Sequence, residues 1–231
     1  MPMKFAFAPP PAPVLAIDGT GELFPVHRIY CIGRNYAAHA IEMGHDPERE
    51  PPFFFQKNPD SLLPSGQAFP YPPGTVDVHH EIELVVALHS GGTNIAIESA
   101  MDRVFGYGVG LDMTRRDLQG EAKKMGRPWE IGKAFEHAAP CTALRRTDAV
   151  GHPGKEGRIY LEVNGAVRQD GDLAQMIWKV PEMISYLSEY FTLQAGDLIF
   201  SGTPAGVGAT VKGDQLRGVV EGIGELLTEV V

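Results

Sequence analysis

Cysteine is scarce in this chain, which has only Cys31 and Cys141 among its 231 residues. Two cysteines cannot supply the disulfide framework of a small secreted domain, so we expect a cytoplasmic protein. No apolar run approaches the roughly 18 residues that a membrane-spanning helix needs. Five prolines interrupt the apolar segment at residues 1–17, which therefore lacks the continuous apolar stretch of a signal peptide.

Basic residues are also few, with 20 Lys and Arg against 29 Asp and Glu, which gives a net charge of -9. Such a chain lacks the electrostatic footprint for nucleic acid or for an anionic membrane. A small anionic substrate stays compatible with this composition, because the local charge of a site decides what it binds.

Glycine and proline are abundant instead, with 27 and 19 residues, and 43% of the chain is hydrophobic. This composition indicates a globular protein with many turns rather than a helical bundle. We predict an α+β protein dominated by strands. A small N-terminal β segment (residues 1–25), with strand-like pieces at 4–8 and 14–17, precedes the main domain (residues 26–231).

Local patterns place the elements of this domain. Apolar runs predict strands at residues 27–33, 53–55 and 105–111, and within 193–200. The Asn-Gly pair at 164–165 predicts a hairpin, because it supplies two positive φ angles. Helical spacing predicts helices over residues 34–44, 97–104, 114–124 and 181–191.

The apolar strand that begins at Val78 contains two carboxylates. Glu81 and Glu83 are two residues apart, so they share one face of the strand with Val85 and Ala87. Taken alone, the pair fits a half-exposed strand with a polar face in water. Asp112, however, ends a second apolar strand, and an acid in that place either caps the next helix or joins the pair.

Three carboxylates about 5 Å apart repel one another by about 3 kcal/mol a pair at an effective dielectric constant near 20. A shared proton or a divalent cation relieves this repulsion. Oxygen ligands suit Mg²⁺, Mn²⁺ or Ca²⁺, whereas the ligand spacing of a zinc site is missing. We therefore expect Glu81, Glu83 and Asp112 to form a site for a hard metal ion.

Other polar residues extend this hypothesis. His39 and Glu42 are neighbours if their segment is helical, and they form either a general base with its orienting carboxylate or a surface ion pair. Lys133 stands between apolar residues, which is unusual for a solvated lysine. Three further polar residues follow Asp112 in the sequence: Arg115, Arg116 and Gln119. Thr203 belongs to the Gly-rich loop 201–208.

The chain resembles the fumarylacetoacetate hydrolase family in seven motifs that follow the family's order: IGRNYAAHAIEMG, PFFFQKNPDSLL, HHEIELVV, GYGVGLDMTRRDLQ, GKAFEHAAP, IYLEVNGAVRQDG and GDLIFSGTPAGVG. Within the family, residues 24–57 are most similar to the fumarylpyruvate hydrolases of bacterial gentisate degradation. The resemblance implies a mixed β-roll with an incomplete barrel, short peripheral helices and a homodimer. Many relatives have Lys-Pro where Asn58 separates Lys57 from Pro59, so Lys57 is left out of the predicted site.

The resemblance also implies an active site. Mg²⁺ or Mn²⁺, with Ca²⁺ as a substitute, would be held by Glu81, Glu83 and Asp112. The implied catalytic and substrate-binding residues are His39, Glu42, Lys133, Arg116, Gln119 and Thr203. The distal carboxylate of the substrate needs a cation, for which Arg34 and Arg115 are the two candidates.

The implied reaction is hydrolysis of a C–C bond in an acylpyruvate, with fumarylpyruvate as the expected substrate and fumarate and pyruvate as products. Three alternatives stay open: hydrolysis of another acylpyruvate, decarboxylation of oxaloacetate, and isomerisation or decarboxylation of catechol-derived diacids. The His39/Glu42 pair favours hydrolysis, because the last two reactions need no activated water. A non-catalytic alternative is a β-rich protein that holds a structural Ca²⁺.

Overall fold

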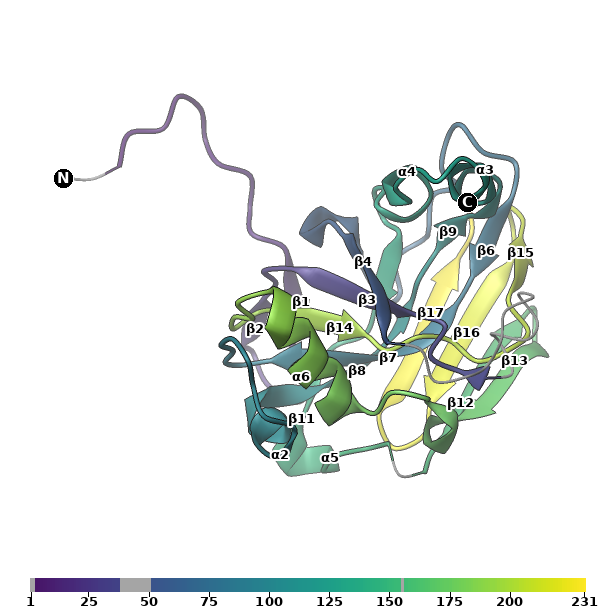
Figure 1. Ribbon diagram of the computed structural model, residues 1–231. Coiled ribbons are helices and arrows are strands. Elements are labelled where there is room, and N and C mark those ends of the chain that lie inside the picture. Colours follow the sequence, from purple (N-terminus) through teal and green to yellow (C-terminus); the bar gives the residue numbers. More distant parts are fainter. Residues whose placement is uncertain (1–2, 38–50, 155) are drawn as a thin grey trace.

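The computed structural model describes residues 3–37, 51–154 and 156–231. Residues 3–13 run away from the body of the protein (Figure 1). Residues 4–8 form no strand, contrary to the expectation from their sequence. After them, β1 (Val14–Ala16) and β2 (Leu23–Pro25) pair as a two-stranded antiparallel sheet. The division of the chain at residue 25 stays a prediction.

The largest sheet has eight strands and contains the predicted strands around residues 27–33, 53–55, 105–111 and 198–200. Its strands are β3 (Ile29–Gly33), β4 (Phe53–Lys57), β5 (Leu62–Pro64), β7 (Ile82–Leu88), β8 (Val104–Leu111), β10 (Ala139–Cys141), β11 (Arg145–Arg146) and β14 (Leu198–Phe200). Their order is β4-β3-β14-β7-β8-β10-β5, and β11 also pairs with β8. The pairs β14–β3 and β10–β5 are parallel and the others antiparallel.

Two smaller sheets complete the β structure (Figure 1). The antiparallel four-stranded sheet is formed by β13 (Ala166–Asp172), β12 (Arg158–Val163), β16 (Gln215–Val220) and β17 (Gly224–Glu229). The three-stranded sheet is formed by β15 (Gly208–Thr210), β6 (Val78–His80) and β9 (Thr114–Arg115). The predicted hairpin is confirmed as β12–β13, where Asn164 and Gly165 have φ angles of 53° and 77°.

The helices are short. They are α2 (Ile97–Ala100), α3 (Arg116–Lys124), α4 (Glu130–Lys133), α5 (Thr147–Val150) and α6 (Val180–Tyr190), with 3₁₀ turns η1 (Pro59–Ser61), η2 (Met101–Arg103) and η3 (Leu173–Gln175). The longest, α6, has Pro181 in its first turn and buries Met183, Ile184 and Leu187 against the core. None of the helices within the described residues is long and apolar enough to span a membrane.

The central strand β7 is buried on both faces. Ile82 and Leu84 point into the main hydrophobic core, which lies between the eight-stranded sheet, the four-stranded sheet and α6. Val85 and Ala87 point into a second core with β1, β2 and β14. The expected alternation is therefore confirmed, and the alternative of a half-exposed strand with a polar face in water is excluded, because the face that carries Glu83 is covered by protein.

Predicted elements other than residues 4–8 also differ from the structure. The helix predicted over residues 97–104 is α2 followed by the 3₁₀ turn η2, and Val104 already belongs to β8. The strand that begins at Val78 is two strands, β6 and β7, and Glu81 lies at the break between them. The helix predicted from Thr114 begins at Arg116, because Thr114 and Arg115 pair with β6 as β9. The predicted α+β fold dominated by strands is confirmed.

Candidate metal and substrate site

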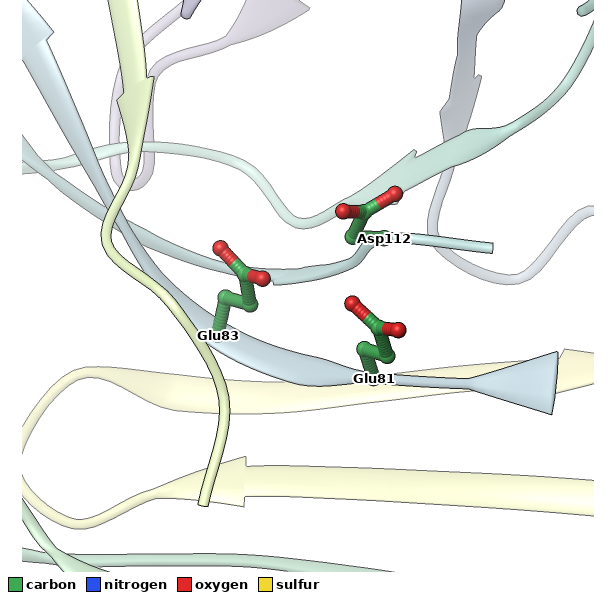
Figure 2. Close-up of side chains that lie close together, drawn as sticks. All are labelled: Glu81, Glu83 and Asp112. Carbon is green, nitrogen blue, oxygen red and sulfur yellow. The ribbon is translucent and has the colours of Figure 1, made fainter. Parts of the chain in front are cut away.

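Three carboxylates meet at the point where β6, β7 and β8 come together. Glu81 follows β6, Glu83 lies within β7, and Asp112 follows β8; each offers an oxygen within 4.8 Å of the other two. Figure 2 shows the two glutamates on the same side of the segment in which β6 passes into β7, with Asp112 beside them. The backbone N–H of Asp112 donates to the carbonyl of Glu81 at 2.8 Å, which fixes the spacing of the two segments.

All three carboxylates are buried, with exposed fractions of 6% for Glu81, 2% for Glu83 and 1% for Asp112. Buried charges are costly unless they are paired or bind a metal.

The site supplies cations from other elements. Lys133, the last residue of α4, places Nζ at 3.0 Å from Glu81 Oε2, 2.7 Å from Asp112 Oδ2 and 2.7 Å from Thr114 Oγ1. Burial lowers the pKa of Lys133, but the charges of Asp112 and Glu81 together raise it by more. The net shift of the pKa is upward, so the lysine stays charged.

Lys57 is a second buried cation of the site, and the sequence analysis left it out. Its Nζ lies 2.8 Å from Asp112 Oδ1 and donates to the carbonyls of Met113 and Lys133 at 3.0 and 2.5 Å. The insertion of Asn58 before Pro59 does not displace it, because Lys57 is still within β4 and pairs with Ile29 of β3. The contacts of Lys57 with Asp112 and with the carbonyl of Lys133 join segments that are far apart in the sequence, so no local sequence pattern reveals them.

Glu83 receives its contact from the backbone. The N–H of Gly202, just after β14, donates to Glu83 Oε2 at 2.8 Å. Burial, followed by the charges of Asp112 and Glu81, raises the pKa of Glu83 well above its usual value. The pKa rises because a third negative charge in this buried space is unfavourable unless a proton or an additional cation balances it.

The donor set fits a hard divalent cation. Among the described residues it consists of three carboxylates without a sulfur or imidazole group, the oxygen chemistry that Mg²⁺ and Mn²⁺ take. Asp112 Oδ1 is buried and its contact with Lys57 lacks the angle of a hydrogen bond, so this oxygen keeps an acceptor position open. The expected metal-binding capacity is supported by this geometry, whereas the identity of the ion is not defined by it.

Arg116, the first residue of α3, is the third cation. Its guanidinium pairs with Glu81 through Nη2 and donates through Nη1 to Gln119 Oε1 at 2.6 Å. Its Nε donates to His79 Nδ1 at 3.3 Å. The proton of a neutral His79 is therefore on Nε2, which lies 2.9 Å from Asp77 Oδ1. Burial, and then Arg116, lowers the pKa of His79, which agrees with the neutral form.

A cavity opens onto these groups. Its lining includes Glu81, Lys133, Arg116 and Gln119, together with residues from β3, β4, the end of α3 and the start of α4: Gly33, Arg34, Phe53, Phe55, Lys123 and Trp129. Thr203 is buried in the loop after β14 and accepts a hydrogen bond from Gln169 Nε2 at 2.8 Å. It is not among the lining residues, so its predicted contact with substrate stays a prediction.

The remaining predicted residues are placed as follows. His39 and Glu42 lie outside the described residues, and so does most of the helix predicted over 34–44. Arg115 turns away from the cavity and lies over the ring of Phe135. The structure thus brings Glu81, Glu83 and Asp112 together with Lys133, Arg116 and Gln119, and adds Lys57, while the catalytic roles stay proposals.

Similar proteins agree with this geometry. The family model described as "Fumarylacetoacetate (FAA) hydrolase C-terminal" matches residues 28–231. A fumarylpyruvate hydrolase of Ralstonia sp is 45% identical over 78% of this chain and 93% of its own. The oxaloacetate tautomerase YcgM of Escherichia coli K12 is 40% identical over 86% of this chain and 90% of its own.

The solved structures include a relative over the full length. The fumarylpyruvate hydrolase from Pseudomonas aeruginosa, in complex with Mn²⁺ and pyruvate, has a TM-score of 0.96 and 52% identity, and the match covers 99% of both chains. The mixed β-roll architecture with short peripheral helices is thereby confirmed. The expectation of an enzyme, a hydrolase acting on C–C bonds, is confirmed as well. The chain belongs to the fumarylacetoacetate hydrolase family.

Proposed function

We propose that this protein hydrolyses a C–C bond of an acylpyruvate with the aid of Mg²⁺ or Mn²⁺, and that fumarylpyruvate is its substrate in aromatic (gentisate) catabolism. The observation that carries the proposal is the set of three buried carboxylates, of which Glu81 and Asp112 are contacted by fixed cations and Glu81 lines a cavity. The names of the Ralstonia and Pseudomonas relatives support the substrate. A homodimer belongs to the same proposal.

Glu81, Glu83 and Asp112 would hold the ion. A bound divalent ion would polarise substrate oxygens and stabilise the negative charge that develops on the pyruvate part during cleavage. Lys133 keeps the carboxylates of Glu81 and Asp112 in place through hydrogen bonds of 3.0 and 2.7 Å. It also places a permanent positive charge beside the position of the keto acid.

The keto-acid end of the substrate would meet polar groups of α3. Gln119 Oε1 is engaged by Arg116 Nη1, so the amide N–H₂ of Gln119 is the part left to donate to a substrate oxygen. Arg116 is fixed from three sides by Glu81, Gln119 and His79, so it offers a positive charge whose position is defined before the substrate arrives. Thr203 would donate its hydroxyl proton, since its oxygen already accepts from Gln169.

His39, oriented by Glu42, would take a proton from the attacking water. The hydroxyl adds to the distal carbonyl carbon, the C–C bond breaks, and the pyruvate carbon that leaves receives a proton. The acyl group then departs as a carboxylic acid. The roles of His39 and Glu42 are proposed because the motif that contains them resembles the corresponding motif of the family.

A second candidate is a keto–enol proton shift on oxaloacetate, favoured by the similarity to the oxaloacetate tautomerase of Escherichia coli. Both reactions bind a 2-keto carboxylate at the same end of the cavity. They differ in the need for water, because only hydrolysis consumes it.

The deciding experiment measures pyruvate release from fumarylpyruvate and acetylpyruvate, and tautomerisation of oxaloacetate, with added Mg²⁺ or Mn²⁺ and with EDTA. We expect metal-dependent pyruvate release that His39→Ala lowers by about 10²- to 10⁴-fold, the usual contribution of a general base. His89→Ala, which removes an exposed histidine of this chain, is the matched control. Full hydrolysis by His39→Ala rejects the base assignment, and metal-dependent tautomerisation without pyruvate release rejects hydrolysis.

Glu81→Gln tests the metal assignment in the same assay. We expect loss of metal-dependent turnover with a circular dichroism spectrum like that of the wild type, because the side chain keeps its shape and its single amide oxygen can still accept from one of the two cations, Lys133 or Arg116. Undiminished turnover at the same concentration of Mg²⁺ would remove Glu81 from the ligand set.

A further inference from the structure

The cavity has a second group of cations, separate from the lysines that contact the carboxylates. Arg34, just after β3, and Lys123, in the last turn of α3, line the same cavity as Arg116. Burial, followed by the charges of Arg34 and Arg116, lowers the pKa of Lys123. The three cations are therefore close enough to repel one another at one side of the cavity, and a bound anion would relieve that repulsion.

Arg34 differs from the other cations of the cavity in its pairing. Lys133 and Arg116 each contact a carboxylate of the metal site. Across residues 3–37, 51–154 and 156–231, no carboxylate forms an ion pair with Arg34, whose guanidinium lies 5.7 Å from the ring centre of Phe53. This half-buried arginine thus presents to the cavity a positive charge that no carboxylate of those residues pairs with.

The backbone of Arg34 is held in an unfavourable conformation. Its φ angle is +58°, a left-handed value that non-glycine residues seldom adopt. Gly33 before it packs against Phe53 so closely that a Cβ on Gly33 would lie 2.5 Å from the ring. Such strain persists only where the surrounding structure enforces it, and it is concentrated at functional positions.

Aromatic rings lie beside both groups of charge: Lys133 Nζ is 4.9 Å from the ring centre of Phe55, and the Arg34 guanidinium is 5.7 Å from that of Phe53. Phe53 and Phe55 of β4 and Trp129 at the start of α4 line the cavity. The ring of Trp129 lies 4.9 Å from that of Phe53 and 5.9 Å from that of Phe55, measured between centroids. Flat apolar walls between charged ends suit a planar, conjugated chain that has a charge at each end.

Arg115 does not fit the same role. Its guanidinium lies 4.4 Å from the ring centre of Phe135, its Nη1 donates to the carbonyl of Ile131 at 3.3 Å, and it does not line the cavity. The structure thus favours Arg34 over Arg115, the two arginines that the sequence left as equal candidates for binding the distal carboxylate.

We propose that Arg34 and Lys123 form a subsite for the second carboxylate of the substrate, so that the cavity selects acylpyruvates whose acyl chain is planar, unsaturated and ends in a carboxylate. The proposal rests on the proposed acylpyruvate hydrolysis and adds its specificity. Arg34 and Lys123 bind the distal end and take no part in the proton transfers.

The test compares fumarylpyruvate with crotonylpyruvate, which has the same chain with a methyl group in place of the distal carboxylate. The quantity measured is the ratio of the two kcat/KM values. We expect Arg34→Met to lower this ratio roughly 10- to 100-fold, the contribution of a hydrogen bond between charged groups, and the Arg34→Met/Lys123→Met double variant to lower it further. Arg34→Lys should restore part of the ratio. Lys124→Met removes the neighbouring exposed lysine, which does not line the cavity, and should keep the ratio of the wild type.

A binding measurement separates this proposal from the proposed function. Fumarate and crotonate are titrated calorimetrically into the Mg²⁺-supplemented wild type and Arg34→Met proteins. If the wild type cleaves both acylpyruvates and Arg34→Met leaves the ratio within threefold, the subsite is wrong and the hydrolysis stands. If the wild type cleaves neither, the hydrolysis fails, and the subsite then stands only if the wild type prefers fumarate and Arg34→Met loses that preference.

Discussion

Replacing Lys57 by methionine tests how the site balances its charge. Lys57 Nζ lies 2.8 Å from Asp112 Oδ1, where the Coulomb attraction is about 6 kcal/mol at an effective dielectric constant of 20. Desolvation of both groups offsets much of this attraction. Removing one partner of a buried pair nevertheless costs about 3–5 kcal/mol, because the other charge stays buried.

We therefore expect Lys57→Met to unfold at a lower temperature than the wild type in EDTA, by roughly 6–20 °C for a chain of this size. The same substitution removes one positive charge beside Asp112, so a divalent cation should bind more tightly. Added Mg²⁺ should consequently raise the melting temperature of Lys57→Met more than that of the wild type.

The assay is thermal unfolding followed by circular dichroism, with a series of Mg²⁺ concentrations and an EDTA reference, together with calorimetric titration of Mg²⁺. Lys124→Met, an exposed lysine on α3, is the control for loss of charge alone. The reasoning is refuted if Lys57→Met melts like the wild type in EDTA, or if Mg²⁺ stabilises both proteins equally.

Two further predictions concern stability. Gly110 faces Glu83 across the β7–β8 pair, and a Cβ there would lie 2.6 Å from Phe200 Cε1, so Gly110→Ala should destabilise the fold by about 1–3 kcal/mol in urea unfolding. Burial raises the pKa of Asp117. Hydrogen bonds from Thr75 and from the backbone N–H groups of Val76 and Leu118 together lower this pKa by more, so the net shift is downward. A lowered folded-state pKa stabilises the fold above the unfolded value of about 3.9 and loses this effect as the pH falls through the folded value. Asp117→Asn should thus cost about 1 kcal/mol at pH 7 and progressively less as the pH falls below the unfolded value and through the folded one.

Both predictions have internal controls. Gly120 lies inside α3 with nothing within 4 Å of an added Cβ, so Gly120→Ala should stabilise the protein by roughly 0.5–1 kcal/mol. Equal effects of the two glycine substitutions would contradict the packing argument. For Asp117→Asn, a destabilisation of the same size at pH 7 and pH 3 would show that the carboxylate charge is not the cause.

The sequence predicts this protein best where the determining interactions are local. The β12–β13 hairpin follows from Asn164 and Gly165, because the required φ angles belong to those two residues. Alternation places Glu83 on the face of Val85 and Ala87, as observed. It does not reveal that the face is covered, since the covering strands β1 and β2 come from a remote part of the chain.

The candidate site shows the same limit. Two acidic residues on one strand and one at the end of another predict the carboxylate cluster, because β7 and β8 are neighbouring strands of one sheet. Lys57 escapes such reasoning, since its contacts depend on how β4 packs at the edge of that sheet. The choice between Arg34 and Arg115 likewise depends on the direction of each side chain, which no spacing in the sequence encodes.

The carboxylates and the cations of the cavity come from different parts of the fold. Glu83 lies in the central strand β7, whereas the cations come from the edge strand β4, from the end of β3 and from the short helices α3 and α4. Changes at the outer positions that do not contact the carboxylates, Arg34 and Lys123, can therefore alter which acid is bound while the three carboxylates stay in place. This arrangement is compatible with the similarity of the chain to enzymes named for hydrolysis and for tautomerisation, which are 45% and 40% identical to it over their aligned residues.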